Sequence, residues 1–151
     1  MTLDESVLQR LVDDSDLRNL VLGMPKHLDG RDWAAYGELF TEDAVFSIGG
    51  QTRRGRQAIA DGPLGDLAKY YQGTQHIMGN IYVDVHGDEA EVRAYVIAVH
   101  IPESADAWTH SDVGGGYEVT ARRTSDGWRI ATCDVFMRWM SGAPFVLAAG
   151  A

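Results

Sequence analysis

The chain contains Leu28-Asp29-Gly30-Arg31-Asp32-Trp33 (residues 28–33) and Phe40-Thr41-Glu42-Asp43-Ala44-Val45-Phe46 (residues 40–46). Between the start and the end of this stretch, the spacing of hydrophobic residues changes from that of a helix to that of a strand. Asp32 directly precedes apolar residues at helical spacing, so we expect it to cap a short helix over residues 33–40. Residues 44–48 then have the pattern of a strand. The stretch therefore predicts the end of the N-terminal helices and the start of a sheet.

Two helices are predicted before this stretch. Thr2 and Glu5 have the spacing of a capping box, and apolar residues follow at helical spacing as far as Leu11. Ser15-Asp16 is a second start signal, before an apolar face that ends at Leu28. Pro25 is expected to kink or interrupt this second helix.

The chain after the stretch is predicted to be mostly strand. Residues 51–54 should return on 44–48 through Gly49-Gly50, and residues 56–71 have helical periodicity around Gly62-Pro63. Strands are expected over 75–86, 89–101, 114–124 and 128–140, with turns at Gly87-Asp88 and Ser125-Asp126-Gly127 and a polar loop over 102–112. His100 and His110 flank this loop, and the glycine run Gly114-Gly115-Gly116 is interpreted as a strand start or bulge with close backbone approach. Residues 142–151 form a small apolar tail, expected on the surface or on a partner subunit.

Helices followed by a long meander indicate an α+β fold. Strands of this length curl strongly, and a curled sheet covered by helices leaves a pocket between the layers. We therefore expect residues 1–151 to form a single domain, with N-terminal helices packed on a strongly curved mixed or antiparallel β-sheet that encloses a pocket. The length of 151 residues suits one domain with a sizeable core.

The composition excludes several classes of partner. A net charge of −9 argues against nucleic acid, and the densest basic run, Arg53-Arg54-Gly55-Arg56, is short. No stretch approaches the roughly 20 apolar residues of a membrane helix, and residues 1–5 lack the basic start of a signal peptide. Cys133 is the only cysteine, which fits a reducing compartment, and its neighbours indicate a buried, inert thiol. We expect a cytoplasmic protein without nucleic-acid or membrane partners.

The quoted stretch resembles the opening signature of the SnoaL-like proteins, which belong to the NTF2-like superfamily with its cystatin-like α+β cone. Gly127-Trp128-Arg129-Ile130 resembles the last-strand signature of the same superfamily. Thr74-Gln75-His76-Ile77-Met78-Gly79 is similar to the stretch of scytalone dehydratase that carries a catalytic histidine. Asp134-Val135-Phe136-Met137-Arg138-Trp139 resembles the C-terminal strand of that enzyme, and Asp29 matches its catalytic aspartate.

The chain also departs from the dehydratase pattern. Leu28 stands where that family has a tyrosine. The family's second histidine, early in the penultimate strand, corresponds here to Gly114-Gly115-Gly116, with His110 a few residues upstream. Half of the family's constellation is thus missing or displaced, and scytalone itself is not the expected substrate.

His76 and Asp29 are the candidate catalytic residues that the resemblance implies. Imidazole titrates near neutral pH, and a carboxylate can orient it or move a proton itself. The alternatives are a histidine satisfied by a neighbouring side chain and an ordinary aspartate at a helix end. Side chains within about 4 Å of each other, in a closed apolar pocket, would favour catalysis. Asp32 is better explained as a helix cap.

Six other residues are candidates for substrate binding. Met78 and Asn80 alternate with His76 on one strand face, together with Tyr82, and Tyr36 or Tyr71 could supply a phenol. His110 could reach the pocket, as could Arg138, for which a surface ion pair is the alternative. His76, His110 and an acid share no compact ligand motif, so we expect no metal and no cofactor.

The resemblance implies a cofactor-independent lyase (dehydratase) or isomerase that removes a proton next to a carbonyl of a small hydrophobic cyclic substrate. Two alternatives stay open: a noncatalytic ligand-binding or accessory subunit, and a polyketide cyclase. A homo-oligomer, either dimer or trimer, is expected through the outer face of the sheet.

Overall fold

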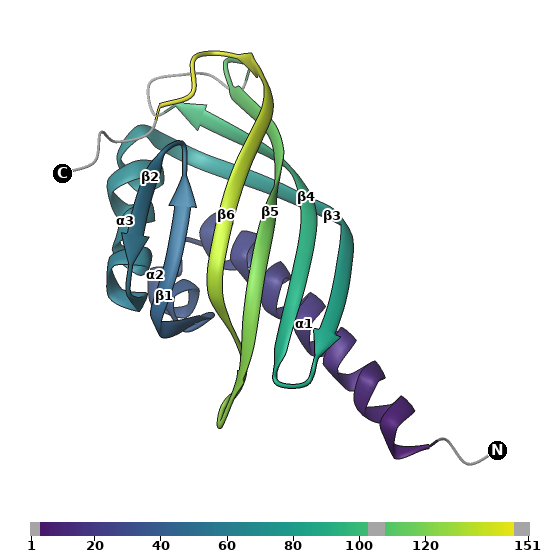
Figure 1. Cartoon of the computed structure of the whole chain (residues 1–151). Helices are drawn as coiled ribbons and strands as arrows, with labels where there is room; N and C mark the ends of the chain where they lie inside the picture. The colour runs from purple at the N-terminus through teal and green to yellow at the C-terminus, as the bar shows by residue number, and fades with distance from the viewer. Residues whose placement is uncertain (1–3, 103–107, 147–151) are drawn as a thin grey trace.

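The computed structural model of the chain describes residues 4–102 and 108–146. Within these residues, helices and strands follow one another from the N-terminal helix to the C-terminal strand (Figure 1). In chain order they are α1 (Glu5–Asp29), α2 (Trp33–Gly37), β1 (Phe40–Ile48), β2 (Gln51–Arg54), α3 (Arg56–Tyr70), β3 (Tyr71–His86), β4 (Glu89–Pro102), β5 (Ser111–Thr124) and β6 (Gly127–Gly142).

The six strands form one mixed sheet in the order β2-β1-β6-β5-β4-β3. β1 runs parallel to β6, and every other neighbouring pair is antiparallel. Helix α1 crosses behind the sheet, and α2 and α3 lie beside β1 and β2 (Figure 1). The core between these layers includes Leu17, Met24, Phe40, Ile59 and Ile130, each at most 1% exposed. The predicted α+β fold, with helices on a curved mixed sheet, is confirmed.

The prediction of two N-terminal helices is wrong, because α1 is continuous through Ser15-Asp16. Asp13 lies just before the predicted break, and its buried carboxylate accepts hydrogen bonds from Arg123 and from Trp128 Nε1 on the sheet. These bonds hold the first half of the helix in line with the apolar second half. The predicted interruption at Pro25 is absent too, since this residue is buried within the last turns of α1.

The two helix caps differ in outcome. The carboxylate of Asp4 caps α1 by accepting from the backbone N–H of Ser6 at 3.0 Å, whereas the predicted cap, Thr2, lies outside the described residues. Asp32 caps α2 as predicted, accepting from the Ala35 N–H at 3.0 Å. Helix α2 is shorter than predicted because Phe40 already pairs with Ile130 of β6.

A β-bulge divides β3 into two halves. Even-numbered residues from 74 on face inward in the first half, and odd-numbered residues face inward in the second. Asn80 has a φ of 49°, and the pairing with β4 shifts register between Gly79 and Tyr82. Before the bulge His76 and Met78 face inward, but after it Ile81, Val83 and Val85 pack on the core. Tyr82 is 58% exposed, so the predicted common face of His76, Met78, Asn80 and Tyr82 is wrong beyond residue 79.

The glycine run on β5 allows close approach, as predicted. A Cβ on Gly114 would lie 1.9 Å from the Trp139 ring, and one on Gly115 would lie 1.9 Å from the Phe136 carbonyl oxygen. The pairing of β5 with β6 shifts register between these two glycines. The run is therefore a packing feature of the sheet.

Candidate active site

Asp29 and His76 form a hydrogen-bonded pair where the end of α1 meets β3. Asp29 Oδ1 lies 2.7 Å from His76 Nδ1, and Oδ2 accepts the backbone N–H of His76 at 2.8 Å. The hydroxyl of Thr74 donates to Oδ1 at 2.9 Å. Three hydrogen bonds thus fix the carboxylate, and the distance lies within the limit of about 4 Å set for a working pair.

The electrostatics of the pair determine which imidazole nitrogen is free. Burial raises the pKa of Asp29, but the hydrogen bonds from the His76 ring, the His76 backbone and Thr74 outweigh it, and the net pKa lies below the ordinary value. An ionised carboxylate can only accept, so Nδ1 of His76 carries a proton and donates it to Asp29. Nε2 is therefore the basic nitrogen, on a side chain that is only 6% exposed.

His100 on β4 places a second imidazole beside His76. The two rings meet edge to face with centroids 5.5 Å apart. The carbonyl oxygen of Ser111 lies 3.2 Å from His100 Nδ1 and can only accept, so Nδ1 is the protonated nitrogen. Burial, and next the proximity of His76, lower the pKa of His100 to about 4. The ring is thus neutral at neutral pH.

Sequence reasoning placed His100 only at the edge of a loop and looked for the second histidine near Gly114. The missed signal is the alternation of β4, whose inward residues Ala90, Val92, Ala94, Val96 and Ala98 lead to His100 at the same spacing.

Both histidines line a partly open cavity of about 70 Å³ between the sheet and the helices. An adjoining lobe of about 50 Å³ shares His76, His100 and Tyr117 with it. The cavity is mainly apolar: its wall includes Leu28, Phe46, Ile48, Ile59, Pro63, Leu67, Val135 and Phe145. Its other polar residues are Tyr36, Tyr117 and the ion pair of Arg53 with Asp66. Burial raises the pKa of both tyrosines, which are therefore neutral hydrogen-bond donors.

The C-terminal segment closes one side of this cavity. Phe145 stacks on Tyr71 with ring centroids 6.0 Å apart, and its ring lies 4.6 Å from that of His100. The backbone N–H of Val146 donates to the Tyr71 hydroxyl at 2.7 Å, and Ser111 Oγ donates to the Pro144 carbonyl at 3.2 Å. The part of the tail that is described thus packs on its own subunit.

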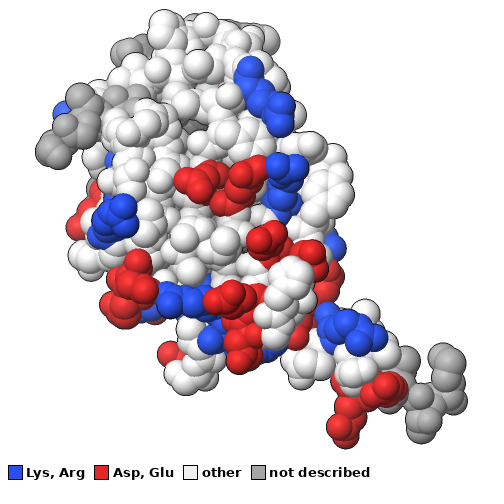
Figure 2. Space-filling model, viewed as in Figure 1, with Lys and Arg blue, Asp and Glu red and all other residues white. Residues whose placement is uncertain are grey.

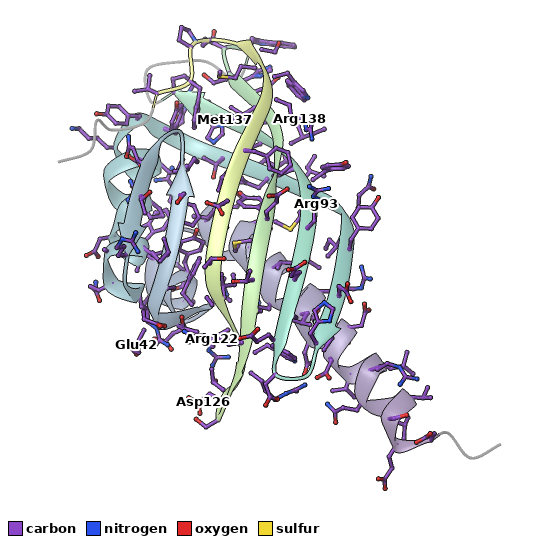
Figure 3. All side chains as sticks on the ribbon, viewed as in Figure 1. Glu42, Arg93, Arg122, Asp126, Met137 and Arg138 are labelled. Carbon is purple, nitrogen blue, oxygen red and sulfur yellow. The ribbon has the colours of Figure 1, made fainter. Side chains whose placement is uncertain are left out.

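The predicted substrate-binding residues are distributed unevenly. Tyr36 lines the cavity, and Tyr71 adjoins it through Phe145. Met78 packs on the core, and Asn80 is exposed on the bulge. His110 pairs with Asp112 at 2.7 Å at the edge of β5. Arg138 is exposed on β6, with its guanidinium 5.1 Å from the Phe136 ring centroid (Figure 3). The structure does not bring these last four into the described cavity wall.

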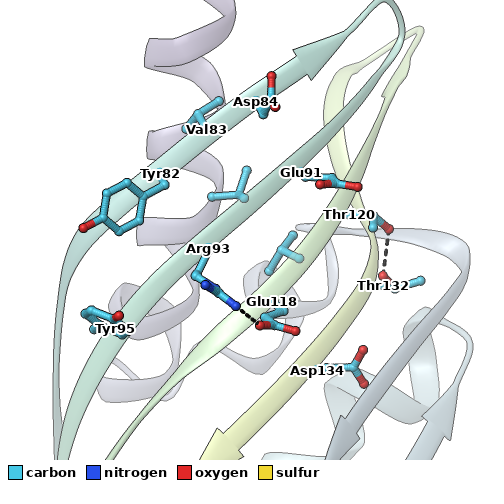
Figure 4. Close-up of a pocket in the computed structure, with 12 residues that line it drawn as sticks. Tyr82, Val83, Asp84, Glu91, Arg93, Tyr95, Glu118, Thr120, Thr132 and Asp134 are labelled. Carbon is cyan, nitrogen blue, oxygen red and sulfur yellow. Dashed lines mark hydrogen bonds and ion pairs between the residues drawn. The ribbon is translucent and has the colours of Figure 1, made fainter.

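A larger hollow, about 940 Å³, lies on the opposite, outer face of the sheet. Tyr82, Arg93 and Tyr95 line it beside four carboxylates, and Arg93 pairs with Glu118 at 2.5 Å (Figure 4). Acidic and basic side chains are interspersed over the middle and lower part of this face (Figure 2). Because the hollow holds neither His76 nor Asp29, the smaller inner cavity is the candidate site.

The described residues contain no cluster of three or more His, Cys, Asp or Glu side chains suited to a metal ion. Cys133 is buried, and burial raises the pKa of its thiol. Across residues 4–102 and 108–146, none of the helices has the length and apolar character needed to cross a membrane.

Comparison with known proteins agrees with this fold. The family model of the SnoaL-like domain matches residues 9–134. A candidate scytalone dehydratase from Novosphingobium aromaticivorans is 23% identical with a TM-score of 0.81, over 92% of this chain and 93% of that one. An NTF2-like protein with a cystatin-like fold from the same organism is 27% identical with a TM-score of 0.77, over 88% and 86%. A type 2 hexachlorocyclohexane dehydrochlorinase, LinA, is 18% identical with a TM-score of 0.82, over 95% and 97%. No curated protein matches the sequence.

Proposed function

The chain belongs to the SnoaL-like domain family, and from that premise we propose that it is a lyase or isomerase that removes a proton next to a carbonyl. The substrate is a small hydrophobic ring compound bound in the inner cavity. One observation carries the proposal: His76, which lines a mainly apolar cavity, is joined to Asp29 behind it at 2.7 Å. Candidate general bases in such clefts are recognised by this combination of geometry and burial.

His76 Nε2 takes the proton in the proposed reaction. The C–H bond breaks, its proton moves to Nε2, and its electron pair forms a C=C bond to the carbonyl carbon while the C=O π pair moves to the oxygen, which gives an enolate. In a dehydration the C=O bond then re-forms, the enolate C=C pair becomes the Cα–Cβ double bond, and the β C–O bond breaks, so that the hydroxide leaves as water with the proton held by His76. In an isomerisation the same proton returns to another carbon. Asp29 keeps Nδ1 protonated and stabilises the imidazolium, as a carboxylate does in other histidine pairs.

In this reaction His100 is suited to form a hydrogen bond as a neutral ring rather than to act as a charged group. Its lowered pKa keeps it neutral at neutral pH, and its Nδ1–H is engaged by Ser111. Its Nε2 can accept a hydrogen bond from a substrate hydroxyl. Leu28, where the dehydratases have a tyrosine, makes that part of the wall apolar.

The cavity volume limits the substrate. A protein-core cavity of about 150 Å³ can hold benzene, whereas the cavity here measures about 70 Å³. Outward movement of Phe145, which lines the cavity, would enlarge it for a one-ring substrate. The same residue favours a second candidate function, a ligand-binding protein without chemistry, because it fills the space that a substrate would occupy.

The test follows proton removal on a panel of one-ring β-hydroxy ketones, by the ultraviolet absorbance of the enone product and by α-proton exchange in D₂O. His76→Ala should lower either rate at least about 100-fold, and Asp29→Asn should lower it by about 100- to 10,000-fold with the fold intact. His86→Ala, a 62% exposed histidine side chain on the same strand, is the matched control and should keep the wild-type rate. Full activity in the His76→Ala protein refutes the proposal. Ligand binding without turnover by the wild type supports the second candidate.

A further inference from the structure

Arg53, from the basic run at residues 53–56, is a cationic side chain that the fold directs inward. It pairs with Phe46 across β1 and β2, so the two residues share the inner face of the sheet. Its neighbour Arg54 alternates to the exposed face. Arg53 lines the same cavity as His76 and His100.

The guanidinium of Arg53 is held in place from one side. Its Nη2 donates to Asp66 Oδ2 of α3 at 2.6 Å, and the Asp66 side chain is only 6% exposed. A Cβ on Gly62 would lie 2.7 Å from Arg53 Cζ, so the guanidinium rests against the α3 backbone. An arginine has five N–H donors in a planar fork, and Asp66 engages one of them in the described contacts.

The proposed chemistry requires a hydrogen-bond donor in the cavity. Removing a proton next to a carbonyl places negative charge on the carbonyl oxygen, and preorganised donors at that oxygen lower the barrier. A guanidinium already paired with a carboxylate is nearly neutral as a unit. It therefore suits an uncharged carbonyl, whereas a free carboxylate ligand would meet the charges of Asp66 and Asp29.

We propose that Arg53 binds the carbonyl oxygen of the substrate, so that the cavity selects uncharged ring ketones with the oxygen toward β2 and the acidic C–H toward His76. This inference rests on the proposed function for the role of the oxygen. Tyr36 lines the same cavity as Arg53.

The experiment compares two probes of the same shape, cyclohexanone and methylenecyclohexane, which differ by an oxygen in place of a CH₂ group. Calorimetry or an NMR titration gives their dissociation constants for each protein. The wild type should bind the ketone about tenfold more tightly or better, the ratio that one charge-assisted hydrogen bond supports. Arg53→Met/Asp66→Asn, which removes both charges together, should bind the two probes equally. Arg54→Met should keep the wild-type ratio.

Arg53→Lys provides a second measurement if the double variant does not fold. It keeps the charge beside Asp66 but loses the planar fork, so the ratio should fall severalfold. Equal binding of the two probes by the wild type, no binding of either, or an unchanged ratio in the Arg53 variants overturns the inference. The ratio of the two dissociation constants is also measured in the His76→Ala protein, because binding of these probes requires no proton transfer. A retained ratio beside an inactive wild type would mean that the proposed function fails while the role of Arg53 stands.

Discussion

Acidification should weaken the fold through His100. The residue is 2% exposed, and its pKa is lowered from 6.5 to about 4, by burial first and by His76 second. The carbonyl of Ser111 and the carboxylates of Asp29 and Asp112 act in the opposite direction. The folded protein thus prefers the neutral ring, while the unfolded chain takes up a proton near pH 6.5.

The sign and size of the effect follow from this difference. The stabilisation is complete above pH 6.5, declines as the pH falls, and is lost once the pH passes through about 4. The difference in pKa corresponds to about 3 kcal/mol in the free energy of unfolding. This is a large share of the stability of a domain of this size, since most lie between about 5 and 15 kcal/mol.

Urea unfolding at a series of pH values between about 7.5 and 4 measures the loss. His100→Gln keeps a polar side chain that does not titrate, so its stability should vary less with pH by most of the predicted amount. His86→Gln is the matched control, because its side chain is exposed and should leave the profile unchanged. The lowered pKa of Asp29 acts below 3.8, outside this window. Equal losses in the wild type and in His100→Gln would refute the view of His100 as a buried neutral base.

Three further outcomes follow from the structure. The pKa of Asp13 is lowered from 3.8 to about 2, chiefly by its hydrogen bond to Arg123, so about 2 kcal/mol more should be lost as the pH falls from 3.8 to 2; thermal unfolding of Asp13→Asn should lack this step. Gly114→Ala should lower the free energy of unfolding by about 1–3 kcal/mol, because its Cβ would meet the Trp139 ring, while Gly73→Ala, which has open space around it, should have little effect in the same urea assay. Phe145→Ala should enlarge the cavity and tighten the binding of methylenecyclohexane, measured by calorimetry against the wild type; unchanged affinity would mean that the ring binds elsewhere.

Most of the element order was predictable because local patterns decide it. Strand β2 has the predicted bounds, and Asp32 caps its helix as expected. The errors arose where a tertiary contact overrides a local signal. Ser15-Asp16 has the composition of a helix start, but the hydrogen bonds of Asp13 to the sheet continue α1 through it. The bulge at Asn80 needs a positive φ, which the alternation of β3 does not reveal.

In the candidate site, too, local motifs predict some residues, whereas others depend on tertiary structure. Asp29 and His76 were found because each lies in a short motif, and the hydrogen bonds between them need only that α1 packs on β3. His100 depends on strand register, since its partner across β3 and β4 is Thr74, two residues from His76. That placement follows from the alternation of β4 once the pairing is known, whereas the family pattern directed attention to β5.

Arg53 shows why a motif search misses the other end of the cavity. Its sequence context is a basic run, and only the pairing of β2 with β1 decides which of its members faces inward. Leu28 makes the wall beside the dyad apolar, and the charged donor stands instead on β2, held by Asp66 of α3. The base lies on one edge of the sheet, and the proposed oxygen-binding group lies near the other edge. The distance between these two groups therefore limits the length of the substrate. Phe145 lines the same cavity as these two groups, so the proposed function predicts a substrate range that depends on the C-terminal segment as well as on the two histidines.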